Sequence, residues 1–149
     1  MRRSTNPSKF LTPAESRQVT AAVEQAEKFT SGEIKVTLAR HCWISIESKA
    51  SRLFNKLNLD RTRHRNCVMI LLVLTNHEFH IHGDQGIHER VGQEFWDDVR
   101  DRMSVCFKED RFGDGLAEGV RLIGEKLAQF FPPLADDTDE ISNHIAHHE

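Results

Sequence analysis

The segment RNCVMILLVLTNHEFHIHGDQGIHE, residues 65–89, decides the fold of this chain. Residues 67–74 are apolar on both faces, which is typical of a central strand covered by helices on both sides. Residues 75–77 predict a short hairpin connection, so the next strand returns antiparallel. That strand carries His80 and His82 on one face and few apolar residues on the other, which places it at the edge of the sheet.

The residues before this segment predict another strand and a parallel crossover. Residues 33–40 alternate between apolar and polar side chains, the pattern of a half-covered strand. Residues 46–57 carry one apolar stripe at helical spacing, and they lie between the two strands. A helical crossover makes the strands that it joins parallel. The predicted strand order is therefore 33–40, 67–74 and the hairpin strand, with 67–74 in the middle.

Further amphipathic helices are predicted outside this unit. Thr12 and Glu15 form a capping-box pattern at the start of a helix over residues 13–29. Apolar side chains at helical spacing predict one helix that starts near Gly92 and another that starts near Phe112 and ends at a proline pair. Gly115, Gly119 and Gly124 inside the last helix predict close packing against a neighbouring element, which offsets their low helix propensity.

The length of 149 residues predicts one domain with a single main core. We divide the chain into a flexible N-terminus (residues 1–10), a domain (residues 11–133) and an acidic, histidine-rich tail (residues 134–149). The tail has little apolar surface to bury, so we expect it to be disordered or only loosely docked on the domain.

The composition is that of an ordinary soluble protein, and the net charge of −3 argues against nucleic-acid binding. The longest apolar run, residues 68–74, is too short to cross a bilayer, and the first residues lack the apolar stretch of a signal peptide. We therefore expect no membrane insertion and a cytoplasmic location. The three cysteines have no metal-type spacing and are expected to be reduced thiols in a monomer.

No sequence motif indicates a reaction. The chain lacks a nucleophile elbow, a P-loop, a dinucleotide-binding glycine pattern, an H-E-x-x-H zinc motif and a C-x-x-C pair. The sequence therefore predicts a candidate site without identifying catalytic residues.

Acidic and amide side chains gather at one end of the predicted sheet. Because the first two strands are parallel and the third is antiparallel, two strand starts and one strand end meet there. This places Glu33, Asn66 and Asp84 together, with Glu89 in the turn that follows. Such oxygen ligands suit a divalent cation, and we expect calcium. Ordinary turn and loop roles for the same residues are the competing interpretation.

Two other polar groups have alternative interpretations. Arg61, Arg63 and Arg65 lead into the same end of the sheet and could bind a phosphate, or they could balance nearby acids from a solvated loop. His80 and His82 share one face of their strand and could ligate zinc if further ligands came close, or they could simply face solvent at the edge.

Four segments together resemble the TPM domain family, which includes a thylakoid-lumen photosystem II repair protein. They are SGEIKV (31–36), RNCVMILLVL (65–74), HGDQGIHERVGQEFWDDV (82–99) and RFGDGLAEGVRLIGEKLAQFFP (111–132). The chain is most similar to the short soluble bacterial members. The resemblance implies a three-layer α/β/α sandwich with a small mixed sheet of three to four strands and about four flanking helices. It also implies that the polar end of the sheet is the functional surface.

The resemblance implies more than one possible activity, because relatives differ in function. Some relatives bind calcium in acidic loops, some are described as acid phosphatases, and others are accessory proteins. The chain departs from the family at His80, at His82 and at Cys67. At the position of Cys67, directly after Asn66, the resemblance implies a glycine. Cysteine adopts some of the backbone conformations open to glycine only at a cost in free energy. The presence of Cys67 therefore puts the expected backbone conformation at the start of the central strand in doubt.

Three functional hypotheses follow from the sequence. The first is a calcium-binding accessory or interaction module. The second is a metal-assisted phosphatase acting on phosphomonoesters, with an arginine neutralising the phosphate. The third is a metal-free module that uses the edge strand or the tail to bind an unknown protein partner.

Overall fold

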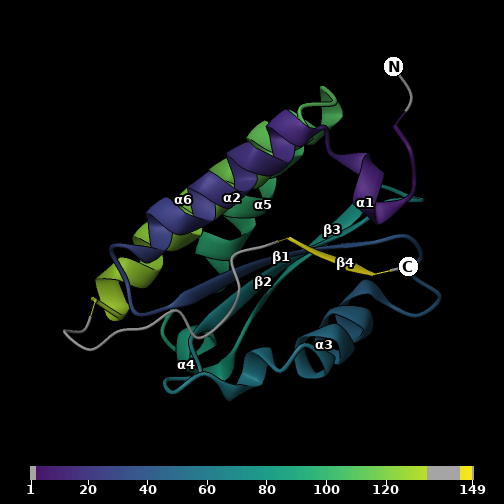
Figure 1. The fold of residues 1–149 in the computed structure, drawn as a ribbon. Coiled ribbons are helices and arrows are strands. Elements are labelled where there is room, and N and C mark those ends of the chain that lie inside the picture. Colours follow the sequence, from purple (N-terminus) through teal and green to yellow (C-terminus); the bar gives the residue numbers. More distant parts are fainter. Residues whose placement is uncertain (1–2, 134–144, 149) are drawn as a thin grey trace.

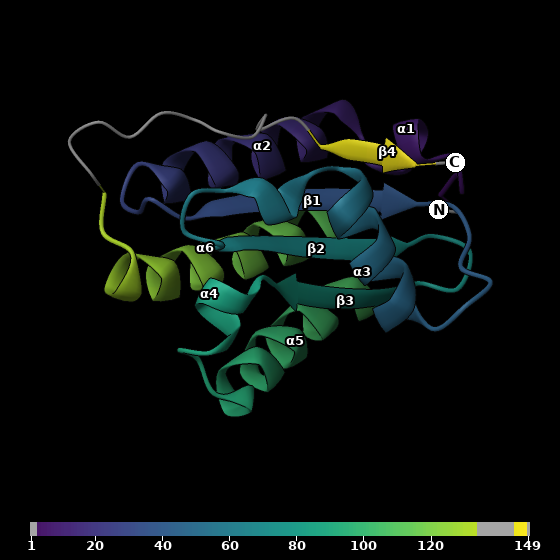
Figure 2. The ribbon, with the colours of Figure 1, turned by 90° about the horizontal axis from the view of Figure 1, so that it is seen from below.

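The structure is a computed structural model that describes residues 3–133 and 145–148. It is a three-layer α/β/α sandwich, as expected: α2, α5 and α6 cover one face of the sheet, and α3 covers the other (Figures 1 and 2). The elements, in chain order, are α1 (Pro7–Phe10), α2 (Pro13–Glu27), β1 (Glu33–Ala39), α3 (Ile46–Lys56), the 3-10 helix η1 (Leu59–Arg61), β2 (Cys67–Val73), β3 (Glu78–Gly83), α4 (Gln85–His88), α5 (Gln93–Lys108), α6 (Phe112–Phe130) and β4 (Ala146–His148).

The sheet has the strand order β3-β2-β1-β4. The parallel pairing of β1 with β2 and the antiparallel pairing of β2 with β3 confirm the predicted order of the first three strands. Residues 146–148 of the predicted tail pair in parallel with β1, so this part of the tail is docked on the sheet and is not disordered. Residues 134–144 and 149, which belong to the same predicted tail, lie outside the described residues.

Strand β1 is buried along its whole length, which corrects the prediction of a half-covered strand. The side chains of Glu33, Lys35 and Thr37 are only 4%, 8% and 0% exposed. The alternation of apolar and polar residues suggested that one face lies in water. In the structure, β1 is an internal strand between β2 and β4, and the side chains on both of its faces are covered.

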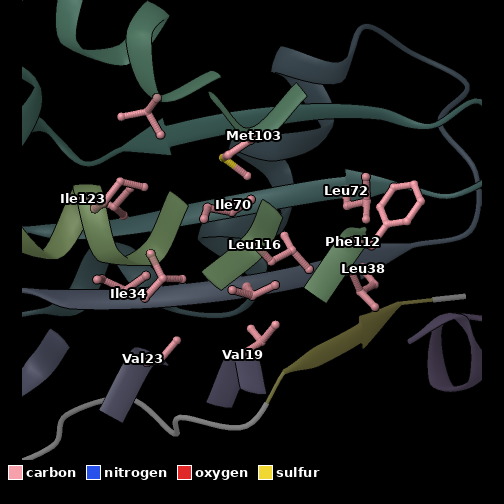
Figure 3. Packing of buried hydrophobic residues seen from close by; sticks show 14 of the residues in the cluster. Val19, Val23, Ile34, Leu38, Ile70, Leu72, Met103, Phe112, Leu116 and Ile123 are labelled. Atoms are coloured by element: carbon pink, nitrogen blue, oxygen red, sulfur yellow. The ribbon is translucent and has the colours of Figure 1, made fainter. Parts of the chain in front are cut away.

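The main core lies between the sheet and the layer of α2, α5 and α6 (Figure 3). Close helix packing explains the glycines of α6, as predicted. A Cβ atom built on Gly119 would lie 2.5 Å from the Met103 sulfur, and one on Gly124 would lie 2.7 Å from the Ala26 Cβ. A second apolar cluster, which includes Phe54 of α3, fills the space on the other face of the sheet.

Residues 3–10 pack against the domain, in contrast to the flexible segment that we predicted for residues 1–10, of which residues 1–2 lie outside the described residues. Arg3 Nη1 lies 2.6 Å from Glu15 Oε1, and Arg3 Nε lies 2.9 Å from Asp110 Oδ1. Phe10 is 2% exposed and contacts the Phe112 ring at a centroid distance of 4.8 Å. These contacts attach the segment to the starts of α2 and α6, so it belongs to the domain.

The Arg3–Glu15 pair makes stability depend on acid pH. Burial alone would raise the pKa of Glu15, but hydrogen bonds from Arg3 and from the N–H groups of Thr12 and Gly113 lower the pKa from 4.5 to about 2. Because the folded-state pKa is lowered, the stabilisation is complete above pH 4.5 and is lost as the pH falls towards 2. A lowering of this size corresponds to roughly 3 kcal/mol, which we reduce to about 1–2 kcal/mol for solvent screening.

We therefore expect Glu15→Gln to lower the free energy of unfolding by about 1–2 kcal/mol at pH 7 and to flatten its pH dependence between pH 4.5 and 2. Urea titrations across this range measure both effects. Glu24→Gln is the matched control, because Glu24 is exposed on the same helix. An acid-dependence curve that is identical in wild type and Glu15→Gln would contradict this prediction.

Candidate functional site

Three segments meet at the end of the sheet where β1 and β2 start, beside α4 (Figure 2). Glu33 is paired with Cys67, and the Glu33 N–H donates to the Asn66 carbonyl at 3.4 Å. On the other side of β2, the Asp84 N–H donates to the Cys67 carbonyl at 2.9 Å. The structure therefore brings Glu33, Asn66 and Asp84 together from separate parts of the chain. All three are at most 5% exposed.

Asn66 is the most unusual residue of this group. It is 1% exposed, and neither its Oδ1 nor its Nδ2 has a hydrogen-bond partner among the residues that the structure describes. Its backbone N–H is satisfied by the Thr62 hydroxyl at 3.3 Å. Buried amides in folded proteins are nearly always hydrogen-bonded, because an unpaired one is costly. An amide oxygen with unused lone pairs therefore lies next to two carboxylate-bearing residues.

Asp84 has a structural role at the start of α4. Its Oδ1 accepts from the Gln85 N–H at 2.8 Å and caps the helix. Arg65 binds the same carboxylate through two hydrogen bonds, from Nε to Oδ2 at 2.7 Å and from Nη2 to Oδ1 at 2.8 Å. Counting two lone pairs on each oxygen, Oδ1 is fully used and Oδ2 retains one acceptor position.

The predicted anion-binding arginines are therefore not equivalent. The Arg65 guanidinium is engaged with Asp84, whereas Arg61 and Arg63 are exposed on the loop that precedes β2. The Arg65 backbone is in the left-handed region with φ 51°. Its carbonyl accepts from the Gly86 N–H at 2.8 Å, so the loop and α4 are held together by their backbones as well as by the ion pair.

Cys67 lies between the acidic residues and is fully buried. Burial raises the pKa of its thiol well above the ordinary value, and the charges of Glu33, Glu27 and Asp84 raise it further. Cys67 also has a regular place in the β2 register, and it is absent from the described non-glycine residues with positive φ. Cysteine is therefore compatible with the backbone at the entry into β2.

Glu27 is a member of this group that the sequence did not indicate. Its Oε2 accepts from the Ile34 N–H at 2.8 Å, so the last residue of α2 reaches the start of β1. In the sequence it is one of several polar residues on an amphipathic helix. Only the geometry of the turn between α2 and β1 brings it to this end of the sheet.

The remaining predicted ligands lie outside the buried group. Glu89 is exposed at the C-terminal end of α4, at the opposite end of this short helix from Asp84. His80 and His82 are half-buried beneath α3, where the His82 ring lies 4.6 Å from the Phe54 ring, and burial lowers the pKa of both. Among the described residues, no group of three or more His, Cys, Asp and Glu side chains is placed to hold a metal.

Comparisons with known proteins agree with the observed fold. The family model described as the TPM domain matches residues 4–126. The NMR structure of the BA42 protein from the psychrophilic bacterium Bizionia argentinensis is 36% identical in sequence. It superimposes with a TM-score of 0.89, over 97% of this chain and 99% of that one.

A second solved structure is more distant. The N-terminal domain of a protein from P. gingivalis is 19% identical and has a TM-score of 0.66, over 93% of this chain and 83% of that one, which shows a shared fold. No curated protein matches the chain. Within the described residues, no helix is long and apolar enough to cross a membrane.

Proposed function

We propose that this chain, which belongs to the TPM domain family, binds a divalent cation through Glu33, Asn66 and Asp84 and acts as a binding or accessory module. The buried amide of Asn66 is the observation that carries this proposal. An unpaired amide oxygen costs free energy in the apo protein, and a cation ligated by that oxygen removes the cost. Calcium is the cation that we favour, because all the available ligands are hard oxygen atoms.

The ligand set explains the strength of binding that we expect. Glu33 offers a carboxylate, Asn66 a neutral oxygen and Asp84 the remaining acceptor position of Oδ2, so water must complete a calcium shell of six to eight oxygens. Arg65 also competes for Asp84. With few charged ligands and an internal competitor, we expect a dissociation constant on the order of 10⁻⁴ M.

A binding role fits the residues better than the alternative of a metal-assisted phosphatase. Cys67 is the nucleophile-type side chain placed among the carboxylates, but its burial keeps it from a substrate. Arg65, the arginine nearest to the acids, is already bound to Asp84. Protein binding through an accessory surface is compatible with the cation site.

Calcium titration by calorimetry tests the proposal. We expect saturable binding to wild type and a roughly 10–100-fold loss of affinity in Glu33→Gln and in Asp84→Asn, two nearly isosteric changes that each remove a charge. Asparagine still caps helices well, so Asp84→Asn should retain α4. Glu24→Gln, on the exposed face of α2, is the matched control.

Two further readouts make the result decisive. Calcium should raise the melting temperature of wild type and of Glu24→Gln by more than that of Glu33→Gln. Glu89→Gln tests whether Glu89, exposed at the end of α4, completes the calcium coordination shell. A loss of calcium affinity in this variant would assign Glu89 as a ligand. Equal binding heats in wild type, Glu33→Gln and Asp84→Asn would refute the cation site.

A further inference from the structure

A second concave site lies at the other end of the sheet, beyond the point where β1 ends. The loop after β1 carries Trp43, and this loop, α3 and the end of β4 enclose a pocket of about 260 Å³. Leu53 of α3 lines it and is 4% exposed. β1 runs from Glu33, at the proposed cation site, to Ala39, just before the loop that carries Trp43, so its whole length separates the two sites. Figure 2 shows the course of β1.

One wall of the pocket is a row of basic residues. Lys49, Arg52 and Lys56 are spaced three and four residues apart on α3, so they share one face of the helix over about 10 Å. Within residues 3–133 and 145–148, none of the three is in an ion pair. By contrast, Arg100 and Arg121 on the opposite layer each pair with acidic side chains.

The lining of the pocket also contains an aromatic ring. Trp43 is 87% exposed, although tryptophan is usually covered in a folded protein. Its ring is stacked on His41, with centroids 5.3 Å apart and an interplanar angle of 28°. The loop is fixed on either side of the ring, because the Cys42 thiol donates to the Ile44 carbonyl at 2.9 Å and Ser45 caps α3. A flat ring is therefore held open to solvent beside the cations.

The local charge is the reverse of the net charge of the chain. Residues 40–56 contain four Lys and Arg residues and one acidic residue, in a chain whose net charge is −3. His148 also lines the pocket. Burial lowers the pKa of His148, and the positive charges of Lys49 and Lys56 lower it further.

We propose that this pocket binds a free nucleoside phosphate, with the base stacked on Trp43 and the phosphate groups held by Arg52 and the lysines on either side of it. Aromatic rings stack on the π-face of any base, and unpaired guanidinium and ammonium groups bind phosphate oxygens through charge-assisted hydrogen bonds. The aromatic and basic parts of the lining thus match the two ends of one nucleotide.

The size of the site favours a small molecule over a protein or a nucleic-acid strand. A stable protein interface buries about 800 Å² on each partner, usually around a cluster of apolar anchors. Here the exposed large apolar residues of the pocket are Trp43 and Ile44, and the remaining exposed positions of α3 are small or polar, such as Ser48 and Ser51. A single exposed stacking platform likewise suits one base better than a strand.

Calorimetric titration of ADP into the full chain, with a chelator present so that the cation site plays no part, tests the assignment. We expect a dissociation constant of roughly 10⁻⁵–10⁻⁴ M. Trp43→Ala and Arg52→Gln should each weaken ADP binding roughly tenfold. Both residues are exposed, so the variants should fold, which circular dichroism checks. Arg17→Gln is the matched control, because Arg17 is exposed on α2 in the other helical layer.

Two further ligands test base stacking and phosphate binding separately. Pyrophosphate lacks the base and adenosine lacks the phosphates, so each should bind at least tenfold more weakly than ADP. The proposal is overturned if either binds as tightly as ADP, if ADP affinity is the same in Trp43→Ala and wild type, or if ADP does not bind at millimolar concentration. Tighter binding of a five-nucleotide oligothymidylate than of ADP would also overturn it, in favour of a nucleic-acid strand.

Discussion

Gly86→Ala is expected to destabilise the protein by about 2–4 kcal/mol, although it adds a single methyl group. A Cβ atom at this position would lie 2.3 Å from the His64 carbonyl oxygen and 2.4 Å from the Arg65 carbonyl oxygen. Both are backbone atoms, so no change of rotamer relieves the overlap. Helix α4 must move outward, which breaks the hydrogen bond from Gly86 to Arg65 and displaces Asp84 from the Arg65 guanidinium.

The same displacement should reach the proposed cation site, because Asp84 both starts α4 and supplies a ligand. We therefore expect Gly86→Ala to weaken calcium binding as well as folding, and urea unfolding and calorimetry measure the two effects separately. Gly92→Ala is the matched control, since a Cβ atom there would have no neighbour within 4 Å. It should change the free energy of unfolding by about 1 kcal/mol or less. A similar loss in the two variants would show that α4 is not held against the loop.

The parts of the fold that the sequence predicted correctly depend on local periodicity. The apolar run of β2, the capping box at Thr12 and Glu15, and the glycines of α6 are each decided within one or two helical turns or one strand. The parallel crossover then fixed which strand ends meet. For this reason the sequence alone could predict that Glu33, Asn66 and Asp84 lie at the same end of the sheet.

The parts that the sequence missed depend on contacts between distant segments. Arg3 pairs with Asp110, 107 residues away, and Ala146 pairs with Thr37. The composition of each terminal segment therefore does not indicate that it has a distant partner. The ion pair between Arg65 and Asp84 was missed for a different reason. Charges that converge can bind each other or a ligand, and only the geometry distinguishes these outcomes.

Phe10→Ala should lower the free energy of unfolding by about 3–5 kcal/mol, the usual loss for a fully buried phenylalanine. Composition alone placed Phe10 in a flexible N-terminus, where the same change would have almost no effect. In the structure its ring is 2% exposed, lies edge-on to Phe112 and is covered by the Arg3 guanidinium at 5.2 Å. Truncation therefore leaves a cavity and also loosens the Arg3 contacts.

Phe29→Ala is the control that isolates burial, because it removes the same atoms from a ring that is 59% exposed. It should change stability by at most about 1 kcal/mol. If Phe10→Ala has an effect as small as Phe29→Ala in urea unfolding, the N-terminal segment is not part of the cooperative unit. If the two differ as expected, the pH dependence assigned to Glu15 should also weaken in Phe10→Ala, since Arg3 contacts both residues. The coupling of these two measurements would show that the segment from Arg3 to Phe10 folds as one element with the starts of α2 and α6.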